Sequence, residues 1–281
     1  MMREDGPDRP NGNLHAETID RIDAAEKAAM ADIFLCADGF ADPADVAHRW
    51  FGNALMLVCR PHPIPPLQRV FGLSSGTPGW QDVLDDVLVE YERRGIAVAP
   101  IQVNTTDLML TQAIAARGLT FTASRAKFLR PAIPPARIEV AYPIRELIPA
   151  DAAPFDALLA TAFKMPIELA GWFATIVGRP GWRCFGALDG DRVVATGAIF
   201  LHAGCAWFGA GATLPQYRGN SLQKGLIAAR IEAAIEDGAD LLTGETSISP
   251  DGTTNPSFLN FRRAGFGIAY ERRIFSTRKE Q

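Results

Sequence analysis

The chain has 281 residues, of which 48% are apolar and 21% charged, so it is long enough for one large or two ordinary globular domains. A net charge of −4 and no evident basic face argue against a nucleic-acid partner. Four cysteines without Cys-x-x-Cys spacing and four histidines without a common spacing predict reduced thiols, no metal site and a cytoplasmic location.

The N-terminal region starts with a polar stretch, residues 1–13, which lacks the apolar core of a signal peptide and is expected to be disordered. Residues 14–130 show the patterns of an α/β domain. Their periodicity predicts helices over 80–95 and 108–118 and strands over 97–103 and 121–129.

A Pro-rich stretch, residues 131–137, predicts a stiff linker to a second α/β domain over residues 138–281. In its first part the patterns predict a strand over 138–147, helices over 149–163 and 167–177, and strands over 182–188 and 192–202 joined by a hairpin turn at Asp189-Gly190.

Residues 193–214 carry no formally charged side chain and are numerous enough to cross a bilayer. The turn expected at Ala203-Gly204 divides them, so two adjacent buried strands explain the stretch better than a membrane helix. We therefore expect no membrane partner.

The segment after the predicted strand 207–213 carries the main functional signal. A short loop leads into a helical pattern that lasts to about Asp237, and the first N–H groups of such a helix lack partners and face an anion well. Gly219 permits close backbone approach, while Arg218 and Lys224 add positive charge. The spacing is neither that of a Walker loop nor that of a dinucleotide-binding fingerprint.

Three more elements complete the second domain. The patterns predict a strand over 239–246, a turn-rich loop over 247–255, and a helix that begins at Pro256 and ends before Gly265. A final strand follows over 268–277. These elements predict a mixed, mostly antiparallel sheet flanked by helices.

The loop Gln216-x-x-Gly219-x-Ser221 resembles the signature Gln/Arg-x-x-Gly-x-Gly/Ala of the GNAT superfamily of N-acetyltransferases, which binds the pyrophosphate of acetyl-CoA. An ordinary strand-to-helix turn is the alternative. The helix that ends in Gly265-Phe266 resembles the second motif of that family, whose Asn or Ser residues touch the pantetheine arm.

The resemblance implies acetyl-CoA as cosubstrate and no metal. The residues implied to hold the cofactor are Thr213, Leu214, Gln216, Arg218, Gly219, Asn220, Ser221, Leu222, Gln223, Ser257, Asn260 and Phe261. Many members have a Tyr at the position of Phe261, thought to protonate the leaving thiolate, so this step has no assigned residue here.

The family's chemistry implies transfer of an acetyl group to a small-molecule or peptide amine. A backbone N–H near Thr213-Leu214 would polarise the thioester. Glu245 at a strand end is the candidate base, although it could simply be a solvated carboxylate. Tyr270 is the second candidate, as base or acid, or else a packed aromatic.

Other candidates are weaker or belong to the acceptor. Glu168 and His202 are further possible bases, and Phe163, Trp172 and Phe173 are expected to wall the acceptor site unless they are core residues. The alternative function is a CoA-binding sensor or assembly module without catalysis, which the missing Tyr favours. A homodimer is compatible with either function.

The first domain echoes the second. Phe71-Gly72 corresponds to Phe208-Gly209, and the helix end at Gly118 to that at Gly265. In place of the phosphate loop, Trp80 and Asp82 would obstruct or repel a pyrophosphate. We therefore expect a tandem pair whose first copy is degenerate and binds no cofactor, although any two α/β segments share some likeness.

Overall fold

Strands of both halves of the chain form one sheet in the computed structural model, which describes residues 15–37, 42, 45–249 and 255–277. The strands are β1 (Val46–Phe51), β2 (Ala54–Cys59), β3 (Arg69–Phe71), β4 (Ile101–Asn104), β5 (Thr120–Pro131), β6 (Ile144–Glu146), β7 (Trp182–Asp189), β8 (Arg192–His202), β9 (Cys205–Thr213), β10 (Leu241–Ile248) and β11 (Gly267–Ser276). Their order is β1-β2-β3-β4-β11-β5-β10-β9-β8-β7-β6.

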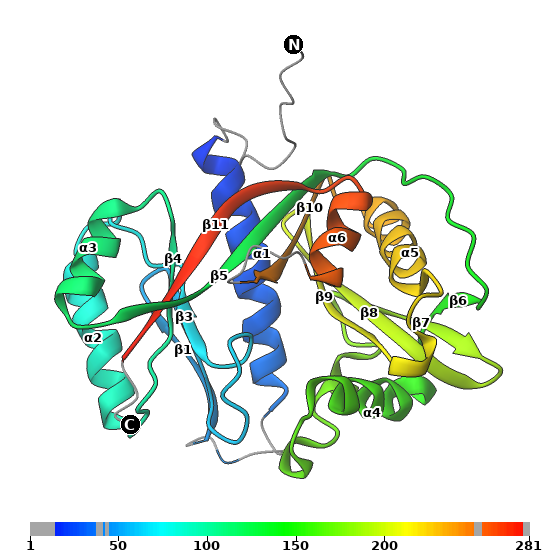
Figure 1. Cartoon of the computed structure of the whole chain (residues 1–281), viewed down its shortest axis with the longest axis horizontal. Helices are drawn as coiled ribbons and strands as arrows, with labels where there is room; N and C mark the ends of the chain where they lie inside the picture. Colours follow the sequence, from blue (N-terminus) through cyan, green and yellow to red (C-terminus); the bar gives the residue numbers. More distant parts are fainter. Residues whose placement is uncertain (1–14, 38–41, 43–44, 250–254, 278–281) are drawn as a thin grey trace.

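The two halves exchange their last strands. β5, which ends the first half, pairs antiparallel with β10 of the second half, and β11 pairs antiparallel with β4 of the first half. β5 and β11 also pair with each other, so they join the halves at the centre of the sheet (Figure 1). Each half is therefore completed by a strand from the other.

Both halves repeat the same connection. In each, two parallel strands, β3–β4 or β9–β10, are linked through a helix, and a second helix leads to the exchanged strand. These helices are α2 (Trp80–Arg93) and α3 (Leu108–Ala116) in the first half, and α5 (Leu222–Glu236) and α6 (Pro256–Arg263) in the second. The predicted tandem arrangement and the mixed, mostly antiparallel sheet are confirmed.

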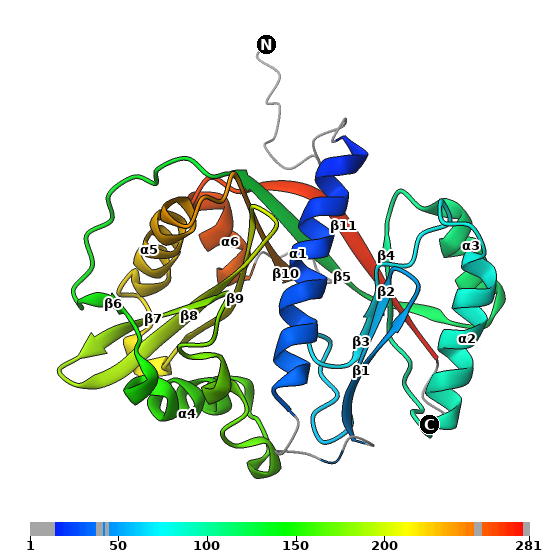
Figure 2. The same cartoon turned by 180° about the vertical axis from the view of Figure 1, so that it is seen from behind.

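Two further helices cover the sheet. α4 (Ala152–Phe163) packs on β8 and β9, and α1 (Ala16–Leu35) runs along the seam between the halves, as Figure 2 shows from behind. Buried residues of α1 such as Met30 and Phe34 share one apolar cluster with Phe155 of α4 and Trp172. The first helix of the chain is thus part of the core of both halves.

The sequence patterns did not predict α1, β1, β2 or β3, but they predicted the later elements with three exceptions. The strand expected over 138–147 is reduced to β6, and that expected over 97–103 begins only at Ile101. The helix expected over 167–177 is replaced by two short 3-10 helices, Ile167–Leu169 and Phe173–Ile176.

The reason for the broken helix is a side chain from α4. The Asp156 carboxylate accepts hydrogen bonds from the backbone N–H groups of Gly171 and Phe173, and Gly171 takes a φ of 88°. These contacts compete with a regular helix.

The remaining predictions on the chain's course concern the membrane and the termini. The uncharged stretch 193–214 forms two strands, with His202 opposite Cys205 at the expected turn. Within the described ranges, no helix combines the length and apolar character that crossing a bilayer needs. The predicted tail, residues 1–13, lies outside the described residues.

Candidate cofactor and acceptor site

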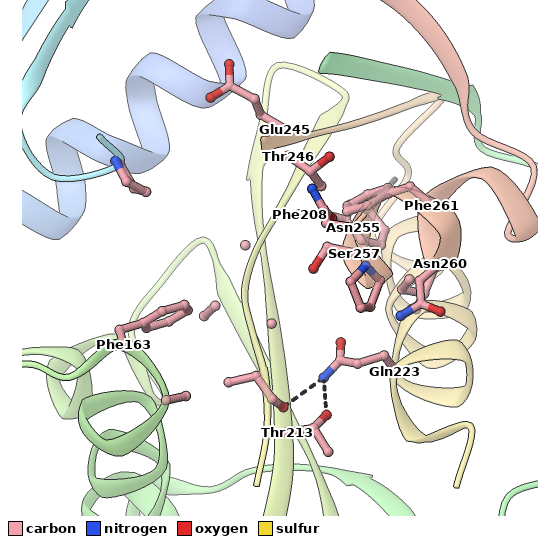
Figure 3. A pocket seen from close by; sticks show the side chains of 18 of the residues that line it. Phe163, Phe208, Thr213, Gln223, Glu245, Thr246, Asn255, Ser257, Asn260 and Phe261 are labelled. Carbon is pink, nitrogen blue, oxygen red and sulfur yellow. Dashed lines mark hydrogen bonds between the residues drawn. The ribbon is translucent and has the colours of Figure 1, made fainter. Parts of the chain in front are cut away.

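A gap between two parallel strands forms the centre of the site. β9 and β10 pair from Cys205–Leu241 to Phe208–Gly244 and then diverge. Beyond this point a cavity of about 1030 Å³ runs between the strand ends, flanked by α5 and α6 on one side and by α1 and α4 on the other (Figure 3). The cavity is therefore lined by elements from both faces of the sheet.

The N-terminus of α5 forms one end of the cavity. Ser221 has a φ of 56° and precedes the helix, and its carbonyl accepts hydrogen bonds from Lys224 and Gly225. Across the described ranges, the amides of residues 219–223 donate no backbone hydrogen bond. Four of these residues, Gly219, Ser221, Leu222 and Gln223, line the cavity together with Arg218 and Lys224, which makes this end suited to a diphosphate.

The start of the helix bears on how the signature is placed. Because α5 begins at Leu222, the signature can also be placed two residues later, but there only Arg218 matches it, with Ser221 and Gln223 in place of the two small residues. The left-handed backbone of Ser221 is one that glycine adopts most easily. Gly219 is left-handed as well, so the loop has two left-handed residues. The spacing of residues in the sequence does not show which of the two stands at the glycine position of the signature.

Gln223 fixes the loop against the sheet. Its side-chain amide donates to the carbonyls of Thr196 (3.0 Å) and Ala212 (2.8 Å) and to Thr213 Oγ1 (3.1 Å) (Figure 3). The first turn of α5 is thus tied to the end of β9, while Gln223 lines the cavity and its backbone N–H donates to none of the described residues.

Most residues implied to hold the cofactor come together. Those that line the cavity are Thr213, Arg218, Gly219, Ser221, Leu222, Gln223, Ser257, Asn260 and Phe261. The cavity wall does not include Leu214, Gln216 or Asn220. Gln216 and Asn220 are exposed, and the side-chain amide of Asn220 donates to the Tyr217 carbonyl.

The backbone N–H that was expected to polarise the thioester, that of Leu214, is already engaged in a hydrogen bond. The Leu214 N–H donates to the Val194 carbonyl and is not available, contrary to the sequence prediction. The pairing of β8 and β9 shifts between Thr196 and Ala198, which leaves a bulge at Ala210-Gly211 with an Ala210 φ of 50°. A bulge leaves backbone groups out of the ladder, so its amides on the cavity wall are the better candidates.

Apolar residues from both halves wall the other end of the cavity. Met30 and Ile33 of α1 and Ile64 and Leu67 of the first half face Phe163, Met165, Phe173, Trp182 and Trp207 of the second half. Trp172 does not take part, because it is buried and its indole N–H donates to the Ile33 carbonyl. Phe163 and Phe173 thus line the cavity, and Trp172 is core.

A buried network of charges forms the floor between these ends. Arg69 binds Glu26 (2.7 Å) and Glu245 (2.9 Å), and Arg272 binds the same two carboxylates at 2.7 Å each. Lys127 adds a further contact to Glu26 at 2.6 Å, and Arg125 pairs with Glu245. Five elements, α1, β3, β5, β10 and β11, supply these side chains.

These contacts argue against Glu245 as a base. Burial and the nearby Glu26 carboxylate raise the pKa of Glu245, but Arg125, Arg272 and Arg69 outweigh them and hold it below its ordinary value. A carboxylate engaged by three arginines is a weak proton acceptor. Its role as base therefore stays a prediction that the geometry does not favour.

The other candidate acids and bases lie away from the cavity. Tyr270 is 3% exposed and donates its hydroxyl proton to Asp23, and burial raises its pKa well above the ordinary value. Glu168 and His202 are exposed and do not line the cavity. Among the described residues, no group of three or more His, Cys, Asp and Glu side chains could hold a metal ion.

Sequence reasoning missed four arginines on the cavity wall: Arg69, Arg125, Arg230 and Arg263. Arg230 could have been noticed, because it lies on the same helical face as the apolar residues Leu226 and Ile227. Arg69 and Arg125 gave no such signal, since their partners come from distant parts of the chain.

Comparisons with known proteins agree on the fold. No family model and no curated protein matches the sequence. Among solved structures, a GCN5-related N-acetyltransferase from Kribbella flavida is 13% identical, with a TM-score of 0.61 over 90% of this chain and 95% of the other. One from Sphaerobacter thermophilus is 14% identical, with a TM-score of 0.60 over 92% and 91%.

A third structure is a tandem GNAT protein from the clavulanic acid biosynthesis pathway. It is 17% identical, with a TM-score of 0.61 over 92% of this chain and 94% of the other. The strand exchange, the diverging β9 and β10 and these likenesses together show that the chain has the fold of the GNAT N-acetyltransferases, in its tandem form, over nearly its whole length.

Proposed function

We propose that the protein is an acetyl-CoA-dependent N-acetyltransferase whose second half binds the cofactor and whose acceptor is a small-molecule or peptide amine. The observation that carries the proposal is the cavity between β9 and β10, which starts at the open amides of the α5 N-terminus. Bound acetyl-CoA would supply an activated acetyl thioester.

The wall of the gap fits such a ligand. Arg218, Lys224 and the amides of residues 219–223 would bind the diphosphate, and Ser257 and Asn260 of α6 would flank the pantetheine arm (Figure 3). Trp207 Nε1 and Thr246 Oγ1 are buried on this wall and have no hydrogen-bond partner in the described part of the protein. Such unpaired groups are rare in native structures and are consistent with a polar ligand.

The amine would enter from the other end, between the apolar residues of α1, α4 and the first half. The carboxylates on the wall, Glu26 and Glu245, are both engaged by cations. We therefore assign the amine proton to water in the cavity rather than to a side chain. The charged floor would orient the acceptor.

A CoA-binding module without catalysis is the alternative, and one observation favours it. The Phe261 ring stacks on Phe128 at 5.1 Å and cannot donate a proton where many family members have a Tyr. Release of free CoA in the presence of an amine panel separates the two functions, once binding has been measured.

Binding is tested by Gly219→Glu. No atom lies within 4 Å of a Cβ at this position, so the carboxylate should point at the diphosphate site and weaken acetyl-CoA binding by about 100-fold, roughly 2.7 kcal/mol. Gly118→Glu is the matched control, because Gly118 has a similar φ (81° against 88°) and the same open surroundings in the first half. Equal calorimetric affinities of both variants and the native protein would refute the cofactor assignment.

A further inference from the structure

Arg230 is a buried cation without a carboxylate partner in the described residues. It is 2% exposed. Its Nε donates to the Leu226 carbonyl at 3.0 Å, and its Nη1 to the carbonyls of Ala198 and Gly209 at 3.4 and 3.3 Å. Its Nη2 donates to none of the described residues. A buried charge held by neutral partners is costly, so its retention calls for a reason.

The charge lies where β9 and β10 begin to diverge. Gly209, whose carbonyl it binds, follows the last paired residue Phe208, and the guanidinium carbon lies 5.0 Å from the centre of the Phe208 ring. Arg230 also lines the cavity. A Cβ on Gly197, opposite the bulge, would lie 2.6 Å from the guanidinium carbon, so the sheet has a glycine where the charge packs.

The position suits the reactive end of the cofactor. Thr213, at the α5 end of β9, is four residues from Gly209, a separation of about 14 Å at roughly 3.4 Å per residue. An extended pantetheine arm covers a comparable length. A cofactor whose diphosphate lies at α5 therefore brings its sulfur toward the bulge, Phe208 and Arg230.

We propose that Arg230 stabilises the CoA thiolate as it leaves, in place of a proton donor; the inference rests on the proposed function. In the transfer, a C–N bond to the amine forms as the C–S bond of the thioester breaks, and the sulfur leaves with the bonding electron pair. The amine gives one proton to water, and the thiolate takes one from solvent after release. A fixed positive charge in a water-poor site favours the ionised sulfur without any proton transfer.

The chemistry of Arg230 and of its neighbour supports this role. Burial lowers the pKa of the Arg230 guanidinium to about 9, so the side chain remains cationic at neutral pH. The aromatic ring of Phe261, 6.5 Å from that of Phe208, has no proton to offer at the same junction. An opposite charge about 4–6 Å from an ionisable group lowers the pKa of an acid by about 1–3 units, which sets the expected effect on the thiol.

The experiment measures ionisation of the thiol of bound CoA, so it needs no acceptor. CoA is bound to the full chain, and the ultraviolet absorption of the thiolate is followed against pH, with bound desulfo-CoA as the background. We expect the pKa of the bound thiol to lie about 1–3 units below that of free CoA. Arg230→Met should remove this shift, and Arg230→Lys should keep part of it.

Arg130→Met is the matched control. Arg130 is also a buried arginine that donates to carbonyls, those of Ala264 and Ile133 among them, but it does not line the cavity. Its replacement should leave the thiol pKa lowered. A thiol pKa in the native complex equal to that of free CoA would overturn the proposal, even if Arg230→Met fails to fold. A lowered thiol pKa that persists in Arg230→Met would overturn it as well. Failure of CoA to bind at all would instead overturn the proposed function and this assignment with it.

Discussion

Replacing Glu245 by Gln should destabilise the protein far more than it slows a chemical step. The Glu245 carboxylate accepts hydrogen bonds from Arg69, Arg125 and Arg272, and its side chain is only 4% exposed. A neutral amide leaves these buried cations short of one counter-charge. Removing one partner of a buried pair costs about 3–5 kcal/mol.

Thermal unfolding followed by circular dichroism measures the loss. For a chain of this size, each kcal/mol lowers Tm by roughly 2–4 °C, so Glu245→Gln should lower it by about 6–20 °C. Glu146→Gln is the control, because the Glu146–Arg183 pair is partly solvated, with side chains 42% and 24% exposed, and is worth only about 0–1 kcal/mol.

The pH dependence of stability provides a second test of the same network. Burial raises the pKa of Glu26, but Arg272, Lys127 and Arg69 hold it well below its ordinary value, and the pKa of Glu245 is lowered as well. Carboxylates with lowered pKa stabilise the fold above the unfolded value of about 4.3, and this stability is lost as the pH falls below it. Glu245→Gln should reduce that acid-dependent loss.

The opposite result would restore Glu245 as a base. In that case the free energy of unfolding of Glu245→Gln would lie within about 1 kcal/mol of that of the native protein, while turnover would fall about 100-fold or more with unchanged CoA affinity. This combination would show that the role of Glu245 is chemical. A double-mutant cycle with Arg125→Gln gives an independent check, since a structural pair should show a coupling of about 0.5–3 kcal/mol in stability.

Two further predictions concern packing and the strand exchange. Gly244→Ala should lower the free energy of unfolding by about 1–3 kcal/mol in chemical denaturation, because its Cβ would lie 2.6 Å from Cζ of Phe261; stability equal to the native protein would show that the ring moves freely. Residues 138–281 expressed alone should not give a folded monomer by light scattering and circular dichroism, because β10 would lack its neighbour β5, and a stable monomer would contradict this expectation.

Local chemistry made much of the fold predictable from the sequence. Hairpin turns at Asp189-Gly190 and Ala203-Gly204, the Pro256 helix start and the periodicity of α2 and α5 all act between near neighbours in the chain. The open amides before Leu222 follow from the same kind of signal, a strand, a glycine loop and a helix. The end of the cavity that we propose for the cofactor was therefore predictable from the sequence.

The remaining features depend on residues far apart in the chain. Nothing in Thr120–Pro131 indicates that this strand pairs with β10 rather than with β4, because the pairing partner is chosen by the whole sheet. The role expected of Glu245 changed for the same reason. Its position at a strand end was predicted, but the arginines that surround it come from β3, β5 and β11.

The first half contributes to the site of the second half, although we predict that its own loop holds no cofactor. There, Trp80 at the start of α2 is buried in the core, and the Asp107 carboxylate accepts hydrogen bonds from Ser75 N (2.7 Å) and Ser75 Oγ (2.6 Å), which fix the loop after β3. The same half supplies Arg69, Met30 and the loop at Ile64 to the cavity of the second half. Because the exchanged strands join the halves, the end of the cavity that we propose for the acceptor is built across the seam, whereas the end proposed for the cofactor lies in the second half. If the proposed function holds, substitutions in the first half can change the acceptor without affecting the proposed diphosphate site.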